Sequence, residues 1–166
     1  MSIILISGVP CCLKTTFGDW LRDNRGFLHV DIESEEFRSG PLLPHWRRTV
    51  PGRVQEFLSV ISRNNSRVVL TWGYPEVCAD WIPSFRTAGV RCLWFFGEVD
   101  LALTNWIGRE GREPTGCARE HFDFLKRKHA EIRASYGAES VETLRPNGVY
   151  LKLPEIARKL RIPPAQ

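Results

Sequence analysis

A segment near the start of the chain has the residue types and the spacing of a phosphate-binding loop. Gly8 is followed by four residues, one further residue and then Lys14-Thr15, a spacing typical of a loop between a strand and a helix. An apolar run at residues 3–6 precedes the loop and an amphipathic pattern follows it, so both neighbours are those that the motif requires. Backbone N–H groups in such a loop, with the positive end of the helix, favour a polyphosphate ligand.

Each position of the loop has an expected task in binding ATP and Mg²⁺. Gly8 permits the sharp exit from the strand, Lys14 reaches the β- and γ-phosphates as a catalytic point charge, and the Thr15 hydroxyl is a ligand of Mg²⁺. Leu13 departs from the motif, because a glycine is expected there. Its Cβ is expected to crowd the backbone beside the phosphates, so the loop is a degenerate Walker A motif. The residues predicted to bind the nucleotide are Gly8, Pro10, Cys11, Cys12, Leu13, Lys14, Thr15 and Thr16.

The size and charge of the chain indicate one globular domain with an anionic ligand. The 166 residues are enough for a single core, and 43% are hydrophobic and 25% charged, which is typical of globular proteins. The net charge of +4 suits an anionic small molecule and a nucleic acid alike. No apolar run approaches the length of a membrane helix, and no secretory leader pattern is visible, so we expect a cytoplasmic protein without membrane contacts.

The five cysteines show no paired short spacing, which favours reduced thiols over a disulfide framework or a zinc site. Cys11 and Cys12 stand beside a predicted helix N-terminus, where the pKa of a thiol is expected to be lowered. This position leaves two interpretations open: a redox switch, or two small residues that suit a tight loop.

Strand and helix patterns alternate along the whole chain and predict an α/β fold. Apolar runs indicate strands at residues 2–7, 27–32, 67–72, 90–96 and 141–144. Amphipathic segments separate them, including a long helix at 118–136, and a last helix begins at Pro154. The alternation predicts a parallel sheet covered by helices on both faces. We expect one domain over residues 1–166, with residues 36–64 as a mobile subregion.

The order of these elements, together with the loop at residues 8–15, resembles the small P-loop kinases: the nucleoside monophosphate kinase fold and its gluconate, shikimate and antibiotic phosphotransferase relatives. The resemblance implies a three-layer αβα domain whose five-stranded parallel sheet has the order 2-3-1-4-5. It also implies a short lid at residues 108–117. Arg109 and Arg112 in the lid, with Arg119 just beyond, would contact the ATP phosphates and stabilise the transferring group when the lid closes.

The same resemblance implies an acceptor site after strand two. Asp31 stands at the carboxyl end of that strand, where ligands bind in parallel sheets, and would accept the proton of a substrate hydroxyl or hold that hydroxyl in line. Glu33 is the alternative carboxylate, although the acidic run at 33–36 also suits a first helical turn. Arg38 is either a ligand for an anionic acceptor or an exposed surface arginine.

The end of strand three lacks the aspartate that P-loop proteins commonly carry for Mg²⁺. Thr71 stands there instead and would act through water, or it is only a strand residue; Mg²⁺ needs few protein ligands. Near the expected cleft lie Trp46, Trp72 and Tyr74, which either stack on a base or sugar or pack in the core. The remaining titratable rings give no metal or base pattern: His45 and His121 are expected to titrate near neutral pH, and His29 is predicted to be buried or at a sheet edge.

Three functions are compatible with this pattern. The first is an ATP-dependent kinase that moves the γ-phosphate to a hydroxyl of a small molecule, mostly by positioning and charge neutralisation. An alternative is a polynucleotide 5′-hydroxyl kinase, favoured by the aromatic and basic segment at residues 45–48 and by the basic long helix. The other alternative is a nucleotide-binding module that has lost turnover, or a scaffold without nucleotide, favoured by Leu13 and by the missing strand-three carboxylate.

Overall fold

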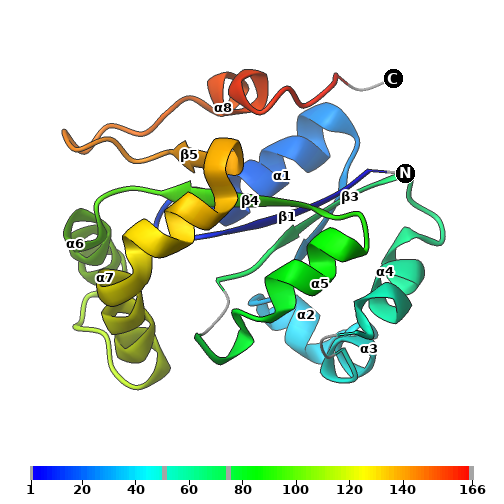
Figure 1. Cartoon of the computed structure of the whole chain (residues 1–166). Helices are drawn as coiled ribbons and strands as arrows, with labels where there is room; N and C mark the ends of the chain where they lie inside the picture. Colours follow the sequence, from blue (N-terminus) through cyan, green and yellow to red (C-terminus); the bar gives the residue numbers. More distant parts are fainter. Residues whose placement is uncertain (1, 50–51, 74–75, 165–166) are drawn as a thin grey trace.

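Five parallel strands lie at the centre of the computed structural model, which describes residues 2–49, 52–73 and 76–164 (Figure 1). Their order in the sheet is β2-β3-β1-β4-β5, and every neighbouring pair is parallel. The α/β class and the strand order predicted from the sequence are therefore confirmed. The strands are β1 (Ser2–Gly8), β2 (Leu28–Asp31), β3 (Arg67–Thr71), β4 (Arg91–Phe96) and β5 (Ser140–Glu142).

Helices cover both faces of this sheet. In Figure 1, α1 and α8 lie on one face, and α4, α5 and α7 lie on the other. The helices are α1 (Lys14–Arg25), α2 (Glu35–Ser39), α3 (Leu43–Arg47), α4 (Val54–Ser62), α5 (Trp81–Thr87), α6 (Val99–Glu110), α7 (Cys117–Tyr136) and α8 (Leu153–Lys159). Within the described ranges, none of them is long and apolar enough to cross a bilayer. Tyr74 lies outside the described residues.

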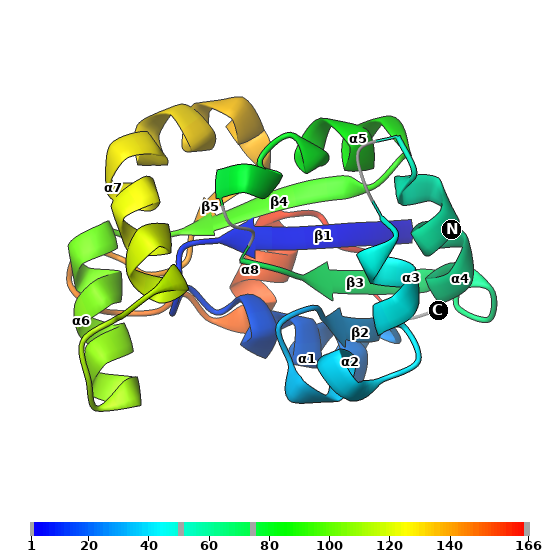
Figure 2. The same cartoon turned by 90° about the horizontal axis from the view of Figure 1, so that it is seen from below.

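The central strand β1 explains why the sheet is parallel and covered on both sides. All of its residues after Ser2 are buried, and it pairs with β3 on one side and with β4 on the other. A strand buried on both faces needs a continuous apolar sequence rather than an alternating one. The carboxyl ends of β1 and β3 point toward the side of the molecule where α6 and α7 lie (Figure 2), and this is where the loop at residues 8–15 leaves the sheet.

Helix α1 packs on the sheet through a close approach at a glycine. Phe17, Gly18 and Leu21 are buried against the strands. A Cβ on Gly18 would overlap the ring of His29 on β2. A glycine inside a helix costs about 0.5–1 kcal/mol relative to alanine, so its presence here indicates that the space is needed for the histidine ring.

Most element boundaries lie within two residues of the sequence prediction, and the largest difference is at the start of the predicted lid. Helix α6 continues through Gly108 and Arg109 to Glu110 and ends at Gly111, which has a φ of 67°. The connecting loop therefore spans residues 111–116 and not 108–117, because an exposed glycine is tolerated inside a helix that continues on both sides. The movement of this loop as a lid, and of residues 36–64 as a subregion, remains a prediction.

The two helical glycines give a matched test of the packing at α1. We expect Gly18→Ala to lower the free energy of unfolding by about 1–3 kcal/mol, because its methyl group must displace the buried His29 ring. Gly108→Ala is the control, since a Cβ there meets no atom within 4 Å, and we expect it to raise stability by about 0.5–1 kcal/mol. Urea unfolding of both variants measures the difference; equal effects would contradict the close approach.

Candidate active site

The loop between β1 and α1 turns through backbone angles that side chains seldom adopt. A Cβ on Gly8 would overlap the carbonyl oxygen of Phe95, so glycine is required at that exit. Cys11 and Leu13 have φ values of 58° and 64°, in the left-handed region. A residue with a side chain pays about 1–2 kcal/mol for this conformation. Leu13 therefore adopts the backbone shape that the missing glycine would adopt without strain.

Lys14 holds the first half of this loop in place. Its ammonium group donates hydrogen bonds to the carbonyl oxygens of Gly8 and Val9, each at 3.1 Å. The amide of Val9 also donates to the carbonyl of Phe95 at 2.9 Å. The charge predicted to meet a polyphosphate thus lies folded over the loop, next to the start of α1.

The second half of the loop is tied through its carbonyls to distant residues. The Tyr150 hydroxyl donates to the carbonyl of Cys11 at 2.9 Å. The buried Thr143 hydroxyl donates to the carbonyl of Cys12, also at 2.9 Å. Both ties come from the segment after β5, which therefore braces the loop from outside.

Most amide groups of the same loop are left without partners inside the described chain. Apart from the Cys12 amide, which closes the turn at residues 10–11, none of the N–H groups of residues 11–16 donates a hydrogen bond to another described residue. Unpaired, convergent N–H groups at a turn with left-handed residues form an anion-binding nest, and the start of α1 adds its positive dipole end. This arrangement fits the phosphates of a nucleotide.

A cavity of about 890 Å³ opens in front of the loop, within the size range of ligand pockets. The loop contributes residues 10–16, and the ends of β2 and β3 contribute further polar groups. Helices α6 and α7 form the opposite wall. Outside the loop, the lining residues are Asp31, Glu33, Ser34, Arg38, Gly73, Asn105, Trp106, Arg109, Cys117, Ala118, His121, Phe122 and Tyr150.

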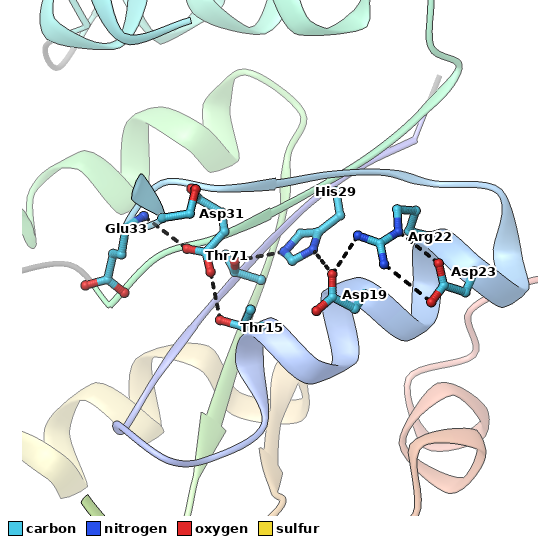
Figure 3. Close-up of polar contacts among 9 residues, drawn as sticks. Thr15, Asp19, Arg22, Asp23, His29, Asp31, Glu33 and Thr71 are labelled. Atoms are coloured by element: carbon cyan, nitrogen blue, oxygen red, sulfur yellow. Dashed lines mark hydrogen bonds and ion pairs between the residues drawn. The ribbon is translucent and has the colours of Figure 1, made fainter. Parts of the chain in front are cut away.

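Two carboxylates from the end of β2 reach this cavity. The Thr15 hydroxyl donates to Asp31 Oδ2 at 2.9 Å, and the Glu33 amide donates to Asp31 Oδ1 at 3.0 Å (Figure 3). Glu33 Oε2 accepts a hydrogen bond from the Gly73 amide at 2.9 Å. The sequence-predicted carboxylates and the predicted metal ligand Thr15 are therefore brought together.

This donor set fits Mg²⁺. A hydroxyl and a carboxylate supply hard oxygen ligands, and Mg²⁺ keeps several waters when it also binds phosphates. In the described parts of the chain, no group of three or more histidine, cysteine, aspartate or glutamate side chains is placed to hold a metal. Thr15 and Asp31 are thus the protein groups that would hold Mg²⁺ beside the nest.

Other predicted residues lie away from the cavity. Trp46 and Trp72 do not line it, but pack into an aromatic cluster. The ring centroid of Trp46 lies 4.9 Å from that of Trp72, 5.1 Å from that of Phe57 and 5.6 Å from that of Trp81. Of the two interpretations of these tryptophans, the structure supports core packing, because aromatic neighbours cover their rings.

Of the three arginines predicted at or near the lid, one lines the cavity and two do not. Arg109 lines the cavity and forms an ion pair with Glu110 at 2.9 Å. Arg112 and Arg119 are exposed and do not line it. Contact of these two with ATP phosphates remains a prediction that requires closure of the loop at residues 111–116.

The expectation of lowered thiol pKa values is wrong. Burial raises the pKa of Cys11, and it raises the pKa of Cys12 to about 12, although Lys14 acts in the opposite direction on both. Desolvation of a thiolate outweighs the helix terminus here, so the structure favours small, packed loop residues over a redox switch.

His121 is a cavity residue whose importance the sequence pattern did not indicate. Both of its ring nitrogens are buried without a hydrogen-bond partner in the described chain. Burial, together with the charge of Lys14, lowers the pKa of His121 to about 4, so the expectation of titration near neutral pH is wrong. Its spacing of four residues from Cys117, one helical turn, could have placed both on one face of α7.

Tyr150 and Asn105 are two further cavity residues that the sequence pattern did not indicate. Asn105 donates to the Tyr150 hydroxyl at 3.1 Å, and both line the cavity. These residues come from α6 and from the segment before α8, far apart in sequence, so no local motif could have indicated the contact.

Comparison with solved structures identifies the fold. A shikimate kinase from Acinetobacter baumannii in complex with shikimate has a TM-score of 0.60 and 17% identity, covering 97% of this chain and 91% of that one. A sugar kinase from a Janibacter species has a TM-score of 0.61 and 17% identity, covering 100% and 99%. A gluconokinase from Sinorhizobium meliloti has a TM-score of 0.53 and 14% identity, covering 95% and 87%.

These comparisons show that the chain has the fold of the P-loop small-molecule kinases, as its sequence pattern predicted. The sequence itself matches no protein-family model and no curated protein. The likeness therefore rests on the arrangement of the strands, the loop and the helices.

The lowered pKa of His121 predicts an acid-sensitive fold. The unfolded chain binds a proton at His121 near pH 6.5, whereas the native state resists protonation until about pH 4. The free energy of unfolding should therefore fall by up to about 3 kcal/mol as the pH falls from 6.5 to 4. Burial and Arg133 also lower the pKa of His129, which acts in the same direction.

Urea unfolding of the wild-type protein and of His121→Gln between pH 7.5 and 4.5 isolates this contribution. The variant should lose part of the pH dependence, while its stability at pH 7.5 serves as the reference. Parallel profiles for the two proteins would show that His121 does not titrate as the buried site requires.

Proposed function

We propose that this protein is an ATP-dependent phosphotransferase that moves the γ-phosphate to a hydroxyl group of a small molecule. The observation that supports this best is the amide nest at residues 11–16, whose N–H groups mostly lack partners in the described chain and whose residues line the same cavity as two carboxylates. A phosphate site and an acceptor site in one cavity suit in-line phosphoryl transfer, where positioning and charge neutralisation supply most of the catalysis.

The loop residues would bind the nucleotide. The amides of residues 11–16 hold phosphate oxygens, and Lys14 exchanges its bonds to the loop carbonyls for bonds to the β- and γ-phosphates. Thr15 and Asp31 would hold Mg²⁺, and the ion would supply positive charge that neutralises the phosphates. Arg109, already at the cavity wall, places a further positive charge beside the transferring group.

The acceptor would bind between the ends of β2 and β3. Asp31 is bonded to the Thr15 hydroxyl, so we assign it to the metal and assign Glu33 to the acceptor hydroxyl, whose proton it accepts. The Gly73 amide fixes the Glu33 carboxylate at 2.9 Å. Arg38 lines the cavity and has no ion-pair partner within the described ranges, which favours an acceptor with an anionic group.

The basic surface of α7 gives less support to a polynucleotide acceptor. Three of its basic side chains already form ion pairs with acidic side chains, and Arg133 lies over the ring of Phe96. The pairs are Lys126 with Asp100, Arg127 with Glu76, and Lys128 with Glu131. Trp46, from the aromatic and basic segment, is committed to the aromatic cluster. A small-molecule acceptor accounts better for the geometry.

Replacement of the loop lysine tests this function. We expect Lys14→Ala to lower ATP-dependent phosphorylation by about 10²–10³-fold, the loss seen when one charge or donor to a transition state is removed. Gluconate, shikimate and free sugars form the first acceptor panel, and ADP release in the presence of Mg²⁺ is the measurement. Lys159→Ala, at an exposed lysine of α8, is the matched control and should keep wild-type activity.

Two outcomes would count against the proposal. Equal turnover by Lys14→Ala and the wild-type protein would remove the loop from the mechanism. Tight Mg-ATP binding without acceptor-dependent ADP release, across a wide panel of alcohols, would favour a nucleotide-binding module.

A further inference from the structure

A series of hydrogen bonds among Asp19, His29 and Thr71 lies beside the Thr15–Asp31 pair, between α1 and the sheet (Figure 3). Its Asp19 end is 43% exposed and also forms an ion pair with Arg22 at 2.8 Å. His29 Nδ1 is 3.0 Å from Asp19 Oδ1, and His29 Nε2 is 3.0 Å from Thr71 Oγ1. The His29 side chain is 4% exposed and Thr71 is 1% exposed. The series thus joins one helix and two strands at the end of the sheet where the loop begins.

The Asp19–His29 contact and the Thr15–Asp31 contact are about equally far apart on α1 and on β2. Thr15 and Asp19 are four residues apart on α1, about 6 Å along a helix. Asp31 and His29 are two residues apart on β2, about 6.6 Å along a strand. The Thr15–Asp31 and Asp19–His29 contacts therefore follow one another along α1 and β2, so the position of one contact determines the position of the other. Gly18, which precedes Asp19 on α1, leaves room for the His29 ring.

The chemistry of these groups fixes the direction of the first hydrogen bond. The Asp19 carboxylate only accepts, so His29 Nδ1 carries the proton. The Thr71 hydroxyl, which can donate or accept, completes the series at His29 Nε2. Thr71 therefore has a structural partner at the position where other P-loop proteins commonly carry a carboxylate.

Thr71 also stands directly beside the metal-binding carboxylate. Its Cα is the register partner of Asp31 across β2 and β3, and Figure 3 places Thr71 between the Thr15–Asp31 pair and the His29–Asp19 pair. A shift of Thr71 or His29 would therefore move the first turn of α1 relative to the end of β2.

We propose that Asp19 and His29, through Thr71, are positioning residues of the metal site, because they hold α1 in the register at which the Thr15 hydroxyl meets Asp31. This inference rests on the proposed nucleotide function for its metal. Its own content is a hydrogen bond from His29 Nδ1 to Asp19 and a dependence of metal-assisted nucleotide binding on residues that touch neither metal nor phosphate.

The first test needs no nucleotide. In the ¹⁵N-labelled wild-type protein, we expect His29 Nδ1 to carry a proton that is hydrogen-bonded to the Asp19 carboxylate. A ring without a proton on Nδ1, or an Nδ1 proton whose signal is unchanged in Asp19→Ala, would overturn the inference because the bond between α1 and β2 would then be absent.

The second test compares ATP binding by calorimetry with Mg²⁺ and with EDTA. Thr71→Val and Asp19→Ala should lower Mg-ATP affinity about tenfold, the usual effect of removing a residue that orients a metal ligand, and should leave metal-free ATP affinity unchanged. Thr71→Ser keeps the donor, and Asp23→Ala removes a neighbouring α1 carboxylate that pairs only with Arg22 in the described chain. Both should stay within about twofold of the wild-type protein.

The outcomes separate the two proposals. If Mg²⁺ did not raise the ATP affinity of the wild-type protein, the proposed function would be contradicted, and with it the metal role of Asp19, His29 and Thr71. The inference alone would be overturned if Mg²⁺ raised the ATP affinity of Thr71→Val and Asp19→Ala as much as that of the wild-type protein. It would also be overturned if these variants lost the same ATP affinity with Mg²⁺ and with EDTA. Thermal unfolding of each variant confirms that the comparison is made on folded protein.

Discussion

The direction of the backbone at residues 8–13 is the constraint on which the site depends. Every carbonyl of residues 8–13 except that of Pro10 accepts a hydrogen bond from a described residue, so these carbonyls already have partners within the protein. The amides that follow are left for a ligand. The left-handed conformations of Cys11 and Leu13 are strained, and strain of this kind persists only where the surroundings determine it fully. Lys14 and the braces after β5 provide those surroundings.

The rest of the fold converts this turn into a site with two sides. The sheet order places the end of β2 next to β3 and one strand away from β1, so carboxylates after β2 reach the first turn of α1. The polar contacts between α1 and β2 hold that distance, and the close approach at Gly18 permits them. Helices α6 and α7 then enclose the cavity, with Arg109 and His121 on its wall. In the proposed function, this arrangement separates the side that would bind phosphates from the side that would bind the acceptor and carries Glu33 and Arg38.

The parallel sheet and the loop could be predicted because each has a local signature: unbroken apolar runs that alternate with helices, and the spacing from Gly8 to Lys14-Thr15. The strand order has no local signature and was implied only by the resemblance to the small P-loop kinases. Side-chain direction has no such signature. Trp46 and Trp72 are near the expected cleft in sequence, yet they turn into an aromatic cluster. The thiols at Cys11 and Cys12 follow burial rather than the helix terminus. Tyr150 reaches the loop from a segment more than a hundred residues later, a contact that only the tertiary fold determines.

The central claim is that this turn holds a triphosphate although Leu13 occupies a glycine position. A crystal structure with a non-hydrolysable ATP analogue and Mg²⁺ tests it most directly. We expect the phosphates within hydrogen-bond distance of the amides of residues 11–16, and the Lys14 ammonium moved from the carbonyls of Gly8 and Val9 to a phosphate oxygen. A turn left empty at saturating analogue, with Lys14 still bonded to its own loop, would contradict the account.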